Sequence, residues 1–125
     1  MNKTSQFISS TFYNFFKKKA VDGALWWLEQ QNINELEKIL NNNDDLVPLI
    51  KPYLTDKHLK QIPPYIRQAI LVYLPSVKVK FINDILNSLN NFGKYRQLLE
   101  NNRSFLQENA LRITNLLIVR LRELD

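Results

Sequence analysis

The spacing of apolar residues predicts helices along almost the whole chain. In the first predicted helix, from about residue 5 to residue 31, apolar positions recur every four residues: Ile8, Phe12, Phe16, Ala20, Ala24 and Leu28. The same kind of stripe predicts helices over residues 76–92 and 104–124. The alternating segment 77–80 has helical signals on both sides, so we interpret it as helix as well.

Prolines punctuate the middle of the chain and predict where its helices break. They lack the amide proton that a helix interior needs, and we expect them to divide residues 44–75 into short helices. These residues are Pro48, Pro52, Pro63, Pro64 and Pro75. Ser76 is expected to cap the next helix, and Gly93 to end it in the left-handed conformation. The predicted fold is all-α, a single compact bundle of about five to seven helices forming one domain over residues 1–125.

The composition contains few of the residues that catalysis and metal binding use. The 125 residues include one His, no Cys and two Gly. His58 has no Cys and no second His with which to share a metal ion, and Asp44 with Asp45 lacks further oxygen ligands at a useful spacing. We therefore expect no enzyme activity, no catalytic residue, no metal and no cofactor. The lack of Cys fits a reducing cytoplasm, and no apolar run reaches the roughly 18 residues of a membrane span.

Charge is unevenly distributed along the chain. The net charge is +5. Residues 29–45 hold five acidic residues against one lysine, whereas residues 46–122 hold twelve basic residues against four acidic ones. Such polarity would orient subunits head to tail, or steer an anionic ligand to one side of the folded protein.

Clusters of basic residues are the candidate nucleic-acid contacts. Lysine and arginine neutralise backbone phosphates without reading the base sequence. The candidates are Lys17, Lys18, Lys19, Lys78, Lys80, Lys94, Arg96, Arg103 and Arg112. Lys57, Lys60 and Arg67 lie around the proline-rich middle, and Arg120 and Arg122 follow later in the last helix. Two alternatives stay open: a solubilising surface, or a basic amphipathic surface that lies on anionic membrane.

Two adjacent tryptophans predict a protein interface. Trp26 and Trp27 point about 100° apart on a helix, so both cannot lie at the centre of one narrow buried face. Tryptophan is enriched at subunit interfaces, and we expect at least one of the two to lie at such an interface.

In size, charge and helical character the chain resembles the small subunit of CRISPR effector complexes of the Cascade type. The resemblance rests on the aromatic first helix over residues 7–28 with Lys17, Lys18 and Lys19, the short central helices, and the basic helices over 76–92 and 104–124. It implies a non-catalytic bundle in a ribonucleoprotein complex of antiviral defence. There it would contact other subunits, further copies of itself, and the backbone of guide RNA, target DNA or displaced DNA. The alternative is a helical adaptor whose basic face docks an acidic protein partner.

Overall fold

The computed structural model describes the backbone of residues 3–124 and the side chains of residues 10–124. Helices occupy 83% of the chain, and the described part contains no strand, so the predicted all-α bundle is confirmed. Seven α-helices and one 3-10 helix, η1, follow one another in this part of the chain: α1 (Lys3–Gln30), α2 (Ile33–Asn41), α3 (Val47–Ile50), η1 (Lys51–Tyr53), α4 (Asp56–Leu59), α5 (Pro64–Leu89), α6 (Gly93–Asn101) and α7 (Arg103–Arg122).

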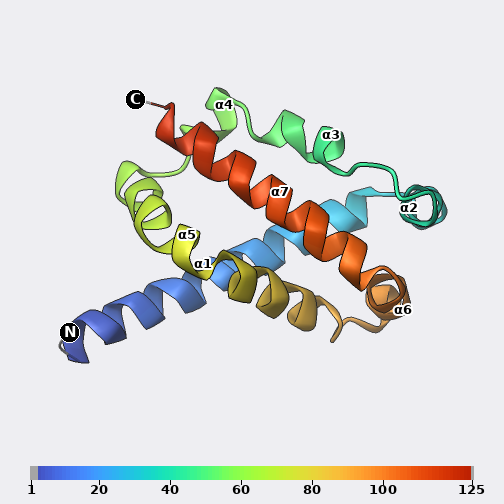
Figure 1. Cartoon of the computed structure of the whole chain (residues 1–125), viewed down its shortest axis with the longest axis horizontal. Coiled ribbons are helices and arrows are strands. Elements are labelled where there is room, and N and C mark those ends of the chain that lie inside the picture. Colours follow the sequence, from blue (N-terminus) through green and yellow to red (C-terminus); the bar gives the residue numbers. More distant parts are fainter. Residues whose placement is uncertain (1–2, 125) are drawn as a thin grey trace.

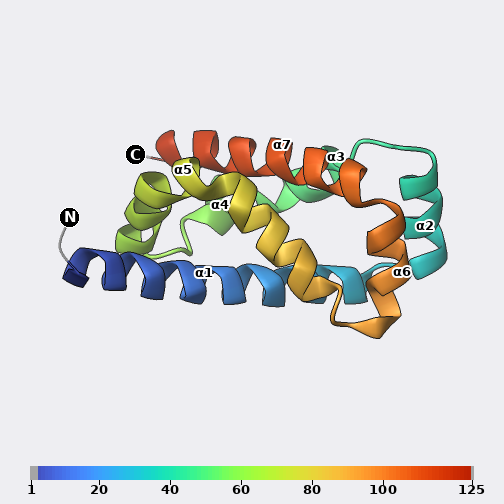
Figure 2. The same ribbon diagram turned by 60° about the horizontal axis from the view of Figure 1, so that its bottom comes forward.

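The three long helices form the frame of the molecule (Figure 1). Helix α5 packs against both α1 and α7, and Figure 2 shows it running between them. The short helices α2 and α6 lie at one end, and α3 lies along α7. None of the helices in residues 3–124 combines the length and the apolar character that crossing a membrane requires.

Short helices are present from residue 47 to residue 59, with Pro48 and Pro52 in the first turns of α3 and η1, but the predicted break at Pro75 is wrong. Pro75 lies inside α5, which continues to Leu89. Its ring fixes a helical φ, so a proline is compatible with a helix that gives up one hydrogen bond and bends. Figures 1 and 2 show this change of direction within α5. Ser76 does not cap a new helix, since its hydroxyl donates to the carbonyl of Tyr73 at 3.0 Å.

The predicted role of Gly93 is also wrong. Helix α5 ends at Leu89 with Asn90 as its cap, and Gly93 is the first residue of α6 without a positive φ. The left-handed residue found in the described chain is Asn43, with φ 55°, in the turn after α2. Asparagine tolerates this conformation better than most residues, so the Asn run after α2 has a direct structural role.

The core consists of two clusters of buried residues. One lies around α2 and α6 and comprises Leu28, Leu36, Leu40, Leu46, Leu89, Tyr95 and Leu99. The other lies around the first half of α5 and the end of α7 and comprises Leu54, Leu59, Ile70, Leu74, Phe81, Ile118 and Leu121. Aromatic rings join α1 to the second cluster, because Phe16 stacks on Phe81 with 5.0 Å between the ring centroids.

Candidate nucleic-acid interface

Three of the nine predicted phosphate contacts form ion pairs with carboxylates. The N···O distances are 2.8 Å for Lys80 with Asp84, 3.2 Å for Arg96 with Glu100, and 2.9 Å for Arg112 with Asp45. Each pair is solvent-exposed to a substantial degree, so it contributes little to stability. Each carboxylate nevertheless offsets the positive charge that a phosphate would meet there.

Two further residues predicted to contact phosphate donate hydrogen bonds to neutral oxygens, and these bonds connect α5 to α7. Lys78 donates to Oδ1 of Asn115 at 2.9 Å. Arg103 lies 3.5 Å from both the carbonyl oxygen and Oδ1 of Asn83. Among the side chains that the structure describes, no carboxylate pairs with these two cations, but the hydrogen bonds hold them against the protein surface.

The remaining four predicted contacts lie on α1 and α6. Three of them lie within 6 Å of the centroid of an aromatic ring: Lys17 over Tyr13 at 5.9 Å, Lys19 over Phe15 at 5.6 Å, and Lys94 over Tyr95 at 5.5 Å. Lys18 is exposed. Such cation–π contacts at exposed sites are worth only about 0.5–1 kcal/mol, so these ammonium groups remain available to an anion.

The structure brings Lys17 and Lys80 together at the ring of Tyr13. Lys80 lies 4.5 Å from the centroid of that ring and also donates to Asp84. The Tyr13 hydroxyl donates to the same carboxylate, which connects α1 to α5. The hydrogen bond from Lys80, followed by that from Tyr13, lowers the pKa of Asp84. The hydrogen bond to Asp84 raises the pKa of Lys80, while burial is the main cause that raises the pKa of Tyr13.

A different group of cations converges on a hollow beside α4. The hollow has a volume of about 670 Å³ and is lined by Pro48, Lys51, Pro52, Leu54, Thr55, Asp56, Lys57 and Arg120. Lys51 belongs to η1, Lys57 to α4 and Arg120 to α7. We call these three residues the cation triad. Within residues 10–124 none of the three forms an ion pair, and Asp56 is the one carboxylate in the lining.

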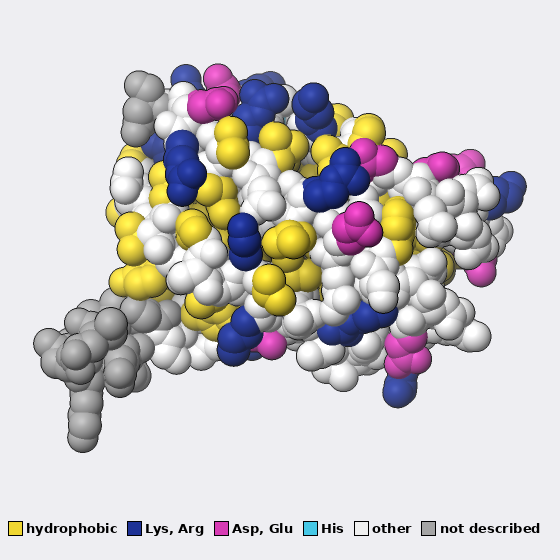
Figure 3. Space-filling view, in the orientation of Figure 1, with side chains coloured by type: hydrophobic (Ala, Val, Ile, Leu, Met, Phe, Trp, Pro, Cys, Tyr) yellow, Lys and Arg dark blue, Asp and Glu magenta, His cyan; other side chains and the backbone are white. Residues whose placement is uncertain are grey.

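The local sequence explains why the triad faces solvent. Leu54 and Leu59 are buried in the second core cluster and anchor the short segment that carries Lys57. Pro48 and Pro52 lie at the starts of α3 and η1, where a missing amide proton costs nothing. On α7, the buried side chains of Ile118 and Leu121 flank the half-buried Arg120. At the top edge of Figure 3, where α4 lies, lysine and arginine side chains are exposed, with acidic side chains among them.

Sequence reasoning did not place the triad together. Lys57 and Arg120 are visible as basic residues, but they are separated by the whole of α5 and α6. Nothing in the sequence around Lys51, apart from the neighbouring Pro52, indicates that it belongs to a binding site. The triad comes together because α3 packs against α7. The spacing of apolar residues along the sequence does not predict which helices pack against each other.

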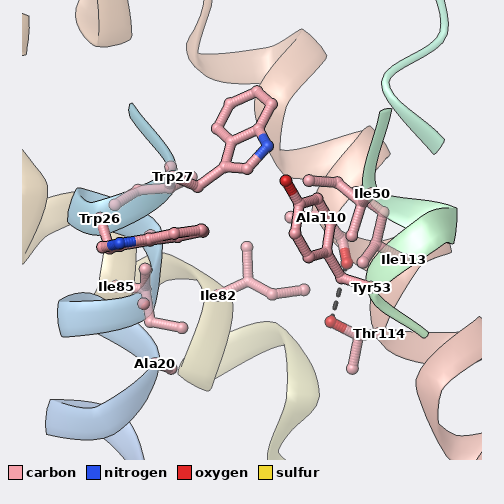
Figure 4. A pocket seen from close by; sticks show the side chains of 13 residues that line it. Ala20, Trp26, Trp27, Ile50, Tyr53, Ile82, Ile85, Ala110, Ile113 and Thr114 are labelled. Carbon is pink, nitrogen blue, oxygen red and sulfur yellow. Dashed lines mark hydrogen bonds between the residues drawn. The ribbon is translucent and has the colours of Figure 1, made fainter. Parts of the chain in front are cut away.

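Both tryptophans of α1 contribute to an apolar pocket. Trp26 is 53% exposed, whereas Trp27 is half-buried. Both line the pocket shown in Figure 4, together with residues of α3, η1, α5 and α7.

Comparison with known proteins gives no relative of the chain. No protein-family model, no curated protein and no solved structure matches it.

Proposed function

We propose that the protein binds the phosphate backbone of nucleic acid, without catalysis, and that the cation triad is its principal contact. The observation that carries this proposal is the convergence of three cations from three separate elements on one hollow. Only Asp56 in the lining opposes them. Lysine and arginine in such a concave setting attract phosphate groups and release condensed counterions from the nucleic acid.

The contact would be independent of base sequence. The triad consists of two ammonium groups on the short helices η1 and α4 and one guanidinium on the long helix α7, and such groups bind backbone phosphates without reading bases. Lys17, Lys18 and Lys19 on α1 would add further backbone contacts away from the hollow. Membership of a larger ribonucleoprotein complex rests on the resemblance to Cascade small subunits, and it stays a proposal.

Fluorescence anisotropy with labelled single-stranded RNA, single-stranded DNA and duplex DNA tests the proposal. Each bound phosphate contributes a slope of about −0.7 to −0.9 in a plot of log Kobs against log salt concentration. Contact through the triad alone therefore predicts a slope of about −2 to −3 for the preferred nucleic acid. If no saturable binding occurs at about 50 mM salt with any of the three probes, the proposal is wrong.

A second candidate function is supported by the outer side of α5. Tyr65, Val72 and Val79 recur every seven residues and are 73%, 65% and 60% exposed. Large exposed apolar side chains at helical spacing favour a protein partner, and the net charge of +5 favours an acidic one. We infer that an adaptor role would use this side of α5.

Charge reversal at the cation triad separates the two functions. The variant combines Lys51→Glu, Lys57→Glu and Arg120→Glu. If the triad binds nucleic acid, affinity falls for every probe and the salt slope becomes shallower. An adaptor that uses the outer side of α5 would instead keep both its nucleic-acid affinity and its protein partner in this variant.

A further inference from the structure

A second, chemically different pocket lies in the middle of the bundle. It has a volume of about 440 Å³, within the range of small-molecule sites. Its lining comes from α1, α3, η1, α5 and α7, as Figure 4 shows for most of its residues: Ala20, Gly23, Ala24, Trp26, Trp27, Ile50, Tyr53, Ile82, Ile85, Leu86, Ala110, Ile113 and Thr114. Several of these side chains pack against the two core clusters, so the pocket lies where the clusters meet.

The space exists because small residues line it on two helices. Ala20, Gly23 and Ala24 lie on α1, and Ala110 lies on α7. A Cβ atom added at Gly23 would meet nothing within 4 Å. Folded interiors are normally close-packed. The side chains around an unfilled apolar space of this size lack dispersion contacts, which a bound molecule would supply.

Two aromatic side chains flank the opening of the pocket. Trp26 and Tyr53 are 53% and 42% exposed, and their rings meet edge to face with 6.3 Å between centroids. Figure 4 shows the two side chains near Ile82, one from α1 and the other from η1. Rigid aromatic side chains in this arrangement offer a large contact area to a flat or chain-like apolar molecule.

The lining excludes a charged group in the interior of the pocket. No Lys, Arg, His, Asp or Glu is among the lining residues. The hydroxyl of Thr114 donates to the carbonyl of Ala110 at 2.7 Å, so its proton is already used. A carboxylate or phosphate placed here would lose its water without gaining a counterion, which is unfavourable.

We propose that this pocket binds an uncharged apolar small molecule, with Trp26 and Tyr53 as the side chains that contact it at the opening. The occupant therefore differs in kind from the polyanion proposed for the cation triad. The two sites share no lining residue, so either proposal can fail while the other holds.

The uncharged fluorescent dye N-phenyl-1-naphthylamine is a suitable probe, because its emission rises in an apolar site and it accepts energy from tryptophan. We expect saturable binding of one dye per chain, with energy transfer from the tryptophans. Gly23→Leu and Ala110→Leu each add a branched side chain to the lining, from α1 and from α7. Each is expected to weaken dye binding at least about tenfold. This loss of affinity corresponds to about 1.4 kcal/mol of binding free energy.

Gly93→Leu is the matched control, because a Cβ at Gly93 also meets nothing within 4 Å but Gly93, on α6, is not among the lining residues. It should leave dye affinity unchanged, and circular dichroism should show that all three variants keep the wild-type helix content. Unsaturable dye binding, or equal affinity in all variants, would overturn the proposal. It would also be overturned if light scattering shows a dimer that Trp26→Ser dissociates while the wild-type protein binds no dye, because the pocket is then a subunit interface.

Discussion

The backbone amide of Leu46 donates to Oδ1 of Asn109 at 3.0 Å, across 63 positions of sequence. Asn109 is 2% exposed, and its Nδ2 donates to the carbonyl of Phe105 at 2.9 Å. One buried side chain on α7 thus satisfies the amide that precedes α3. This bond holds the segment of α3 and η1 against α7, and that segment contributes to both the cation triad and the apolar pocket.

We expect Asn109→Leu to destabilise the protein by about 1–3 kcal/mol, because it leaves the Leu46 amide buried without a partner. Urea unfolding followed by circular dichroism measures the loss. Asn87→Leu on the exposed side of α5 is the control and should change stability by less than about 0.5 kcal/mol. Equal midpoints for Asn109→Leu and wild type would contradict the role given to this hydrogen bond.

The Tyr13–Asp84–Lys80 contact should make stability depend on pH. The pKa of Asp84 is lowered from its ordinary value of 3.8, so its contribution is present above that value and is lost as the pH falls through the folded-state pKa. Asp84→Asn is therefore expected to lower the urea midpoint at pH 7, with the difference from wild type shrinking below about pH 4.

Glu108→Gln is the control for this pH series, because Glu108 is exposed on α7 and forms no ion pair within residues 10–124. Its urea midpoint should follow that of the wild-type protein at each pH. A constant difference between Asp84→Asn and wild type from pH 7 to pH 3 would show that the carboxylate charge contributes nothing.

Replacing Gly23 by alanine should stabilise the protein. Gly23 lies inside α1 without a positive φ, and an added Cβ meets nothing within 4 Å. Alanine is favoured over glycine in a helix interior by about 1 kcal/mol, so we expect a gain of about 0.5–1 kcal/mol in the free energy of unfolding. Thermal and urea unfolding measure it, and a loss of stability would mean that Gly23 is required for contacts in the bundle.

Most of the fold could be predicted from the sequence because its long helices have regular apolar stripes. Leu28 at the end of the first stripe and Phe81 within α5 are buried as their spacing indicates. The predicted break at Pro75 is wrong, because a helix anchored on both sides of a proline by buried residues such as Leu74 and Phe81 bends instead of ending. Helix propensities describe how much a proline destabilises a helix, but they do not describe the tertiary packing that offsets this loss.

The candidate site was less predictable than the fold. Charge counts identified the basic character of the protein, but three predicted cations, including Lys80, form ion pairs with carboxylates. The i+4 spacing of Lys80 with Asp84 and of Arg96 with Glu100 could have revealed two of these pairs. The pair between Arg112 and Asp45 spans 67 positions and depends on tertiary packing, as does the approach of Arg120 to Lys51.

A comparison of two triple variants tests the central claim most directly. One removes the cation triad (Lys51→Gln, Lys57→Gln, Arg120→Gln), and the other removes the three carboxylate-paired cations (Lys80→Gln, Arg96→Gln, Arg112→Gln). Both lower the net charge by the same amount, so a general charge effect cancels. We predict that the first variant weakens nucleic-acid binding more and makes the slope of log Kobs against log salt shallower by about 2 to 3. Equal slopes for the two variants, or a larger change in the second, would contradict the assignment of the triad as the phosphate-binding site.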